Sequence, residues 1–154
     1  MDPDPIKLAT RRYFLRDCWT GIGAVGTTIY GITHFNALEF WEAHEAWEEL
    51  WLVAESDVEQ FLQGLIQVAA AYHHLKRGTF RGGVRLFDSG LARLSRFPAG
   101  FCGIDRTDVE SASRVHQAWA RERLENADSV ARLASGAYPK ISVVGKTSPQ
   151  ISDW

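Results

Sequence analysis

Apolar residues recur every three or four positions along most of the chain, which is the spacing of one face of an α-helix. This pattern predicts a helix over Val25–Phe35, a tight turn over Asn36–Glu39 and a second helix over Phe40–Ala54. We expect the inner face of the second helix to carry Trp41, His44, Glu48, Trp51 and Leu52.

A third helix is predicted over Asp57–Arg77. Ser56 and Glu59 have the spacing of a capping box that starts a helix, and Gly78 suits the position that follows a helix end. Apolar residues lie on nearly all sides of this helix, so we expect it to be the central buried helix.

Two further helices follow. The fourth begins after Thr79 and ends before Pro98. Its apolar seam is formed by Phe80, Val84, Phe87, Leu91 and Leu94. The last helix begins at a second capping box, Thr107 and Glu110, and runs toward Leu133.

These elements predict a single all-α domain, a five- or six-helix bundle whose second and third helices form a buried antiparallel central pair. A length of 154 residues suits one domain. The domain is expected to cover residues 25–136, between an N-terminal extension of residues 1–24 and an irregular C-terminal tail of residues 137–154. The extension is predicted to hold a helix, with Asp4 as N-cap and Pro5 at its first position, and a Gly-rich linker.

Gly21, Gly23 and Gly26 match the G-x-G-x-x-G spacing of dinucleotide-binding turns. That fingerprint requires a strand before the glycines and a βαβ unit around them, and the sequence predicts neither. We therefore interpret the glycines as part of the linker.

Residues 10–16 are similar to the S/T-R-R-x-F-L-K motif of twin-arginine export signals. Asp17 at the start of the following apolar stretch and the lack of an A-x-A cleavage site before Ala37 argue against such a signal. We expect a cytoplasmic protein, with export through residues 10–33 as the alternative. Cys18 and Cys102 form no C-x-x-C motif, so we expect buried reduced thiols.

A net charge of -2 excludes the strongly basic field that non-specific nucleic-acid binding requires, so no nucleic-acid partner is expected. The longest uncharged stretch, residues 18–33, is rich in Gly and Thr, so no membrane span is expected. The composition is unusual in its 6 Trp, 8 Phe and 4 Tyr. An aromatic surface could therefore support a homo-oligomer.

Candidate chemistry is concentrated in the second and third helices. Eight acidic and no basic residues lie from Glu39 to Glu59, and most of these carboxylates suit a solvated face. His44 and Glu48 differ, because positions i and i+4 point the same way and share the face of the tryptophans. The polar residues of the third helix that could meet this pair are Gln63, Gln67, His73 and His74.

Two interpretations of this cluster are open. Imidazoles and carboxylates on facing helices are ligands for Zn, Fe or Mn, and helical bundles hold such sites in their cores. Alternatively, the same groups form a buried His–Glu–Gln hydrogen-bond network that fixes the helix pair. The H-E-x-x-H motif of zinc peptidases is not met, because its last position is Glu48.

Two blocks of the chain resemble a family of small, all-helical prokaryotic proteins of unknown function that are described as predicted metal-dependent hydrolases. Residues 35–51 match FN-x-x-x-(F/Y)-x-E-A-H-E-x-x-E-x-x-W, and residues 61–74 match F-L-Q-G-L-I-Q-x-A-x-A-x-H-H. The resemblance covers about residues 26–97, and Leu38 stands where the family usually has Gly. It implies functional positions at His44, Glu45, Glu48, Gln63 and His73, and less directly at His74.

These observations lead to two functional hypotheses. In the first, the chain is a metal-dependent hydrolase in which His44, Glu48 and His73 hold a divalent ion. Glu45 then orients or deprotonates the bound water. The supporting polar cluster would comprise Gln63, Gln67 and His74. In the second, the chain is a non-enzymatic helical interaction or scaffold protein and the cluster is a structural lock. The sequence names no substrate.

Overall fold

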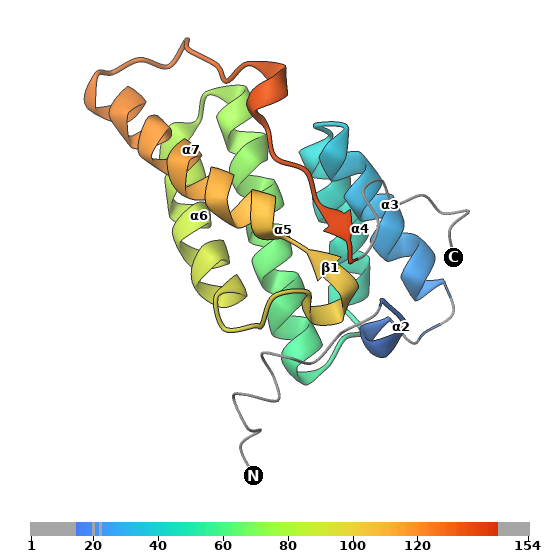
Figure 1. Cartoon of the computed structure of the whole chain (residues 1–154). Coiled ribbons are helices and arrows are strands. Elements are labelled where there is room, and N and C mark those ends of the chain that lie inside the picture. The colour runs from blue at the N-terminus through green and yellow to red at the C-terminus, as the bar shows by residue number, and fades with distance from the viewer. Residues whose placement is uncertain (1–14, 20, 22, 145–154) are drawn as a thin grey trace.

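The computed structural model describes residues 15–19, 21 and 23–144, which form a bundle of helices with a small sheet (Figure 1). In chain order the helices are α2 (Leu15–Cys18), α3 (Ala24–Asn36), α4 (Phe40–Trp51), α5 (Ser56–Arg77), α6 (Phe80–Leu94) and α7 (Thr107–Glu125). The 3-10 turns are η1 (Phe101–Gly103) and η2 (Ser135–Ala137), and the strands are β1 (Ile104–Asp105) and β2 (Ser142–Val143). The prediction of an all-α bundle is confirmed.

The sequence led to predictions about a helix, an export motif and a glycine linker in the N-terminal region, and about membrane spans. The predicted helix start at Asp4 and Pro5 and the arginine pair Arg11 and Arg12 lie outside the described residues. Gly23 precedes α3 with a φ of 77°, a conformation that favours glycine. None of the helices in the described part of the chain has the length and apolar character needed to cross a membrane.

α5 is the central helix of the bundle, as predicted. It lies between α4 and α6, while α3 packs against α4 and α7 packs against α6 (Figure 1). Phe61, Leu65 and Tyr72 of α5 are almost completely buried. Because each large apolar side chain contributes about 1.5–3 kcal/mol when it is buried, this helix supplies much of the stability of the fold.

The inner face of α4 differs from the predicted one. The buried residues of this helix are Phe40, Ala43, Ala46 and Trp47. Trp41 is 45% exposed and Leu52 is 72% exposed, so the expectation that they face the core is wrong. The face of α4 that carries Phe40 and Trp47 is buried because it contacts both α5 and α3. Phe40 stacks on Tyr72 of α5 at 5.3 Å, and Trp47 packs on α3.

A close crossing of α5 and α6 surrounds Gly64. A Cβ atom placed on Gly64 would lie 2.9 Å from Leu94 Cγ, and one on Gly90 would lie 2.9 Å from Val68 Cγ2. This side of α5 therefore faces α6, since Leu94 and Arg93 lie nearest to a Cβ atom on Gly64. Glycine at both positions lets the two backbones approach each other closely.

The turn between α3 and α4 forms where it was predicted. Leu38 has a φ of 64°, the left-handed conformation that a glycine would adopt freely. This conformation costs a non-glycine residue about 1–2 kcal/mol. Lys76 Nζ donates a hydrogen bond to the Leu38 carbonyl at 2.7 Å, which helps to hold the turn. At its other end, α4 stops at Trp51 and does not continue to Ala54.

Neither predicted capping box forms. The residue before α5 is Glu55, whose side chain makes no capping hydrogen bond. Before α7, the Asp105 carboxylate accepts the backbone N–H of Thr107 at 3.0 Å. Glu110 binds the guanidinium of Arg106 and not a backbone N–H. The sequence spacing suited a cap, but at α7 the Glu110 side chain binds the nearby Arg106 side chain instead.

α7 ends at Glu125 and does not run toward Leu133. The Asp128 carboxylate accepts the backbone N–H groups of Val130 at 3.0 Å and Ala131 at 3.1 Å. An aspartate that binds its own following backbone in this way replaces the helix by a turn.

The two cysteines form a disulfide that links α2 to η1. The expectation of reduced thiols is therefore wrong, because the fold brings together Cys18 and Cys102 from positions 84 residues apart. Trp19 packs beside the disulfide with an exposure of 4%, and its Nε1–H donates to the Cys102 carbonyl at 3.2 Å.

The chain after η2 returns to the bundle. β2 pairs with β1 in antiparallel fashion, with Ile104 opposite Val143. The Asn36 side chain donates to the Ile141 carbonyl and accepts its N–H, both at 2.8 Å. Tyr138, Ile141 and Val143 are buried, so residues predicted as an irregular tail contribute to the core.

Candidate functional site

α4 presents polar side chains on two sides of its buried face, and each side lines a different pocket. Glu42, Glu45 and Glu49 line a pocket shared with α3. His44 and Glu48 line a pocket shared with α5. The residues that were predicted to form one site are therefore divided between two places.

The pocket between α4 and α5 has a volume of about 250 Å³. It is lined by His44, Glu48, Trp51, Gln63, Ile66, Gln67, Ala70 and Leu86. The structure thus brings together four of the predicted residues, two from each helix. We call this the His44 pocket.

His44 and Glu48 form the charged centre of the His44 pocket. His44 Nδ1 lies 3.6 Å from Glu48 Oε2, and the two side chains are 16% and 49% exposed. This separation is longer than a hydrogen bond. His44 Nδ1 is buried, and among the described residues it has no hydrogen-bond partner. The expectation of a buried Glu48 carboxylate is wrong, but a half-exposed carboxylate can still turn toward the imidazole and orient it.

Two amide side chains face this pair from α5. Arg93 of α6 donates through Nε to Gln67 Oε1 at 3.1 Å and through a second nitrogen to Gln60 Oε1 at 2.5 Å. Because the Gln67 oxygen is engaged by Arg93, its amide N–H groups are left as donors. Gln63 makes no side-chain hydrogen bond within the described residues. The pocket therefore offers amide donors opposite an imidazole.

His73 and His74 lie outside the His44 pocket. The Trp41 ring stacks on His44 at 4.7 Å and contacts His73 at 5.1 Å, so the indole packs against both imidazoles. His74 Nδ1 is 2.6 Å from Thr79 Oγ1, at the start of α6. Burial lowers the pKa of His73, and the charges of His74 and Arg77 lower it further.

A metal centre needs more than these residues supply. Catalytic zinc sites use three protein ligands, whereas the His44 pocket offers His44 and Glu48 with amides beside them. Among the described residues, no group of three or more His, Cys, Asp or Glu is placed to hold a metal ion. The assignment of His44, Glu48 and His73 as metal ligands stays a prediction.

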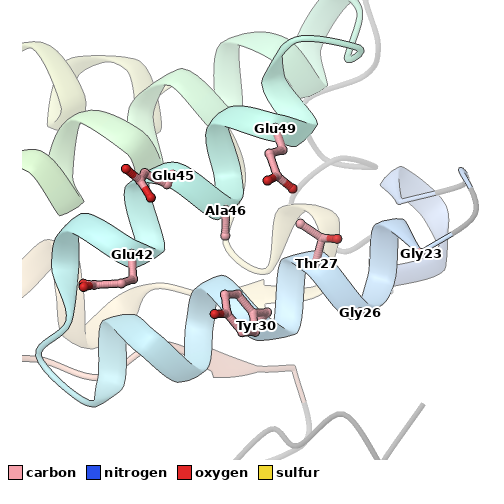
Figure 2. Close-up of a pocket in the computed structure, with 8 residues that line it drawn as sticks. All are labelled: Gly23, Gly26, Thr27, Tyr30, Glu42, Glu45, Ala46 and Glu49. Carbon is pink, nitrogen blue, oxygen red and sulfur yellow. The ribbon is translucent and has the colours of Figure 1, made fainter.

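The second pocket, between α3 and α4, is acidic and has a volume of about 440 Å³. Figure 2 shows Glu42, Glu45 and Glu49 of α4 along one wall, with Thr27 and Tyr30 of α3 opposite. Glu45 Oε1 accepts the indole N–H of Trp41 at 2.8 Å. Glu45 thus lines a different pocket from His44. In that position it does not face the His44 pocket, where it was predicted to orient or deprotonate a bound water.

A buried polar cluster between α5 and α7 was not predicted. Tyr72 Oη lies 2.8 Å from His116 Nδ1 and 3.2 Å from Ser113 Oγ. Burial raises the pKa of Tyr72 and lowers the pKa of His116. Ser113 and His116 lie three positions apart on the inner face of α7. This helical spacing is the feature of the sequence that could have indicated the cluster. Because all three residues are buried in the core, we interpret the cluster as a structural lock.

The lowered pKa of His116 predicts acid-sensitive stability. Since burial holds this pKa below the ordinary value of 6.5, the unfolded chain binds more protons below about pH 6.5. The contribution of His116 to the free energy of unfolding should therefore be greatest above that pH and should fall as the pH drops through the folded-state pKa. His73 and His74, whose pKa values are also lowered by burial, act in the same direction.

The measurement is the melting temperature of wild type and His116→Gln across this pH range. We expect wild type to lose roughly 2–4 °C for each kcal/mol of stability that acid removes. The slope should be smaller in the variant, which has no imidazole to protonate. Equal slopes in the two proteins would show that His116 does not carry the effect.

The central part of the chain is similar to proteins without an assigned activity. Residues 28–86 match a family model described as a domain of unknown function, DUF309. This match includes both helices of the His44 pocket. An uncharacterized protein of Aquifex aeolicus (strain VF5) is 30% identical over 78 residues, which are 50% of this chain and 23% of that protein. The chain thus spans about a quarter of the length of this curated relative. Similarity to a family of unknown function agrees with that part of the resemblance seen in the sequence, and neither the family model nor the relative names a reaction.

Proposed function

We propose that the chain is a hydrolase domain whose active site is the His44 pocket, with His44 as general base and Glu48 as the group that orients it. The observation that carries the proposal is the His44 imidazole, whose buried Nδ1 faces Glu48 at 3.6 Å. A buried nitrogen without a partner is costly. Its place beside a carboxylate, at the wall of a pocket, is the arrangement of a histidine that accepts protons.

The chemistry follows from the groups around the pocket. With Nδ1–H directed to Glu48, the other ring nitrogen takes a proton from water, and the resulting hydroxide attacks an ester or amide carbonyl. Glu48 stabilises the imidazolium, which then returns the proton to the leaving group. The amide N–H groups of Gln67 and Gln63 suit the negative charge that develops on the carbonyl oxygen. The described lining of this pocket holds no Ser, Thr or Cys, which favours water as the nucleophile.

Hydrolysis of p-nitrophenyl acetate, an ester, and p-nitroacetanilide, an amide, tests this proposal. We expect wild type to hydrolyse at least one probe and His44→Gln to lose about 100-fold or more of that rate. Glu48→Gln should also be slower, whereas Glu49→Gln should match wild type because Glu49 lines the other pocket. Absence of turnover in wild type, or equal rates in wild type and His44→Gln, would contradict the proposal.

A chelator added to the same assay tests the metal hypothesis separately. Loss of turnover with EDTA and recovery with Zn, Fe or Mn would add a divalent ion to the site. Turnover that is indifferent to the chelator leaves His44 as the base by itself. In either case the His44→Gln result decides whether this pocket is the active site.

The alternative function, a non-enzymatic interaction or scaffold protein, is favoured by one observation. Leu52 and Val53, at the end of α4, are 72% and 80% exposed, and Trp41 is 45% exposed on the same helix. Exposed apolar side chains of this kind suit contact with a partner or a second copy. The alternative becomes the better account when wild type hydrolyses neither probe.

A further inference from the structure

The Cys18–Cys102 disulfide has one partly accessible end and one buried end. Cys102 is fully buried. Cys18 is partly exposed and lines a pocket of about 430 Å³ beside the turn between α4 and α5. Much of the pocket wall is apolar, with contributions from Trp19, Leu50 and Val53. A small thiol in this pocket therefore reaches Cys18 without opening the bundle, whereas Cys102 is shielded.

The disulfide joins a short N-terminal segment to η1. α2 is a four-residue helix, and a helix of that length has no stability of its own. Among the described residues, its further contacts include the buried side chains of Leu15 and Trp19 and the hydrogen bond from Trp19 to the Cys102 carbonyl. The main contacts between α3, α4, α5, α6 and α7 do not involve this segment, although Leu15 and Trp19 pack into the same apolar core.

The other end of the disulfide lies where the C-terminal strand joins the fold. Cys102 has a φ of 58°, an unfavourable conformation for a residue with a side chain. The next residue, Gly103, accepts the backbone N–H of Val144 at 2.9 Å, immediately before β1 pairs with β2. The disulfide therefore connects the N-terminal segment to the point where the C-terminal segment is anchored.

We propose that Cys18 is a thiol–disulfide exchange site, at which a dithiol reductant detaches residues 15–19 from η1 while α3 to α7 stay folded. A thiolate of the reductant attacks Cys18 Sγ and forms a mixed disulfide, and Cys102 leaves as a thiolate that takes a proton from water. The second thiol of the reductant then displaces Cys18, so the reductant leaves as a disulfide and two electrons have reduced the protein. The loosened region comprises residues 15–19, η1 and the small sheet.

Dithiothreitol acting on the full chain without denaturant tests the proposal. The reduced fraction is followed by iodoacetamide labelling and mass spectrometry, and amide hydrogen exchange is measured before and after reduction. We expect native reduction within about tenfold of the rate in the urea-unfolded chain. Exchange should accelerate in residues 15–19 and 101–105 and stay unchanged in α5.

Two outcomes would overturn the proposal. Reduction that proceeds only when α5 loses its protection would make the disulfide an inaccessible structural crosslink. Unchanged exchange in residues 15–19 after full reduction would show that the disulfide does not hold the segment. The control is the double variant Cys18→Ser/Cys102→Ser, in which dithiothreitol should change no exchange rate.

The choice of Cys18 as the attacked residue has its own test. Cys102→Ser leaves Cys18 as the free thiol, and Cys18→Ser leaves Cys102. With glutathione disulfide as the probe, the first variant should form the mixed disulfide at least about tenfold faster, because the Cys102 sulfur is shielded. Equal rates, or faster reaction at Cys102, would contradict the assignment. If either single variant fails to fold, the wild-type reduction kinetics still decide the proposal.

Discussion

Arg106→Met is expected to lower the free energy of unfolding by about 3–5 kcal/mol, the effect of removing one partner from a buried charged network. Arg106 is only 4% exposed. Its guanidinium donates to the carbonyls of Leu94 at 2.9 Å, Phe97 at 2.5 Å and Pro98 at 3.1 Å, and it pairs with the Glu110 carboxylate. Methionine keeps much of the volume but leaves these acceptors without their donor.

The effect is large because Arg106 joins three parts of the fold. The carbonyls belong to the last turn of α6 and the loop that follows it, and helix ends need such partners for their last carbonyl groups. Arg106 itself immediately precedes α7, and its guanidinium lies 5.5 Å from the Phe61 ring of α5. Loss of this side chain should therefore loosen the contact of α6 and α7 with the central helix.

Urea denaturation of wild type and Arg106→Met measures this prediction. Arg114→Met is the matched control, because Arg114 lies on the exposed side of α7 and should change stability by no more than about 0.5 kcal/mol. Arg106→Lys should fall between the two, since lysine keeps the charge but lacks the planar fork that reaches several carbonyls at once. A loss below about 1 kcal/mol for Arg106→Met would mean that water replaces the guanidinium.

Local patterns predicted the helices well because a helix is specified by neighbouring residues. The apolar spacing placed α3, α5 and α6 close to their observed bounds, and Gly78 occupies the left-handed position after α5. The i, i+4 relation of His44 and Glu48 was equally local, and both residues line one pocket. The predictions at the helix ends were less accurate, because spacing does not determine which partner a side chain binds. Glu110 had the spacing of a capping residue but binds Arg106.

Features that depend on the packing of distant segments could not be predicted from local spacing. α4 carries two aromatic stripes, and only the positions of α3 and α5 determine that Phe40 and Trp47 are buried while Trp41 is not. Eighty-odd residues separate the two cysteines, and sequence spacing alone says nothing about whether their backbones meet. His116 is another example, because its partner Tyr72 lies on a different helix.

The predicted site was divided for the same reason. Glu45 follows His44 directly in the chain, and adjacent positions on a helix point in different directions. Rotation of α4 relative to the predicted inner face therefore turned Glu45 toward α3 and His44 toward α5. Whether neighbouring residues of the motif line one pocket therefore depends on which helix each side of α4 faces.

Gly31→Ala is expected to destabilise the protein by about 3 kcal/mol, at the upper end of the usual cost of overpacking a core. A Cβ atom on Gly31 would overlap the indole of Trp47, with a separation of 2.6 Å from its Cδ1 atom. Trp47 is completely buried and packs against Phe35, so the ring has no free space into which it can move. The Trp47 ring thus occupies the space that a side chain at position 31 would need.

Gly26→Ala, on the same helix, supplies the matched control. A Cβ atom on Gly26 would meet nothing within 4 Å, so alanine there should stabilise the protein by up to about 1 kcal/mol through its better helix propensity. The two substitutions are chemically identical, and we therefore expect urea denaturation to give opposite signs. Trp47→Phe should recover part of the loss in the Gly31→Ala background, because the smaller ring makes room for the methyl group and couples the two positions. Equal behaviour of Gly31→Ala and Gly26→Ala would show that the contact between α3 and α4 is looser than the structure describes.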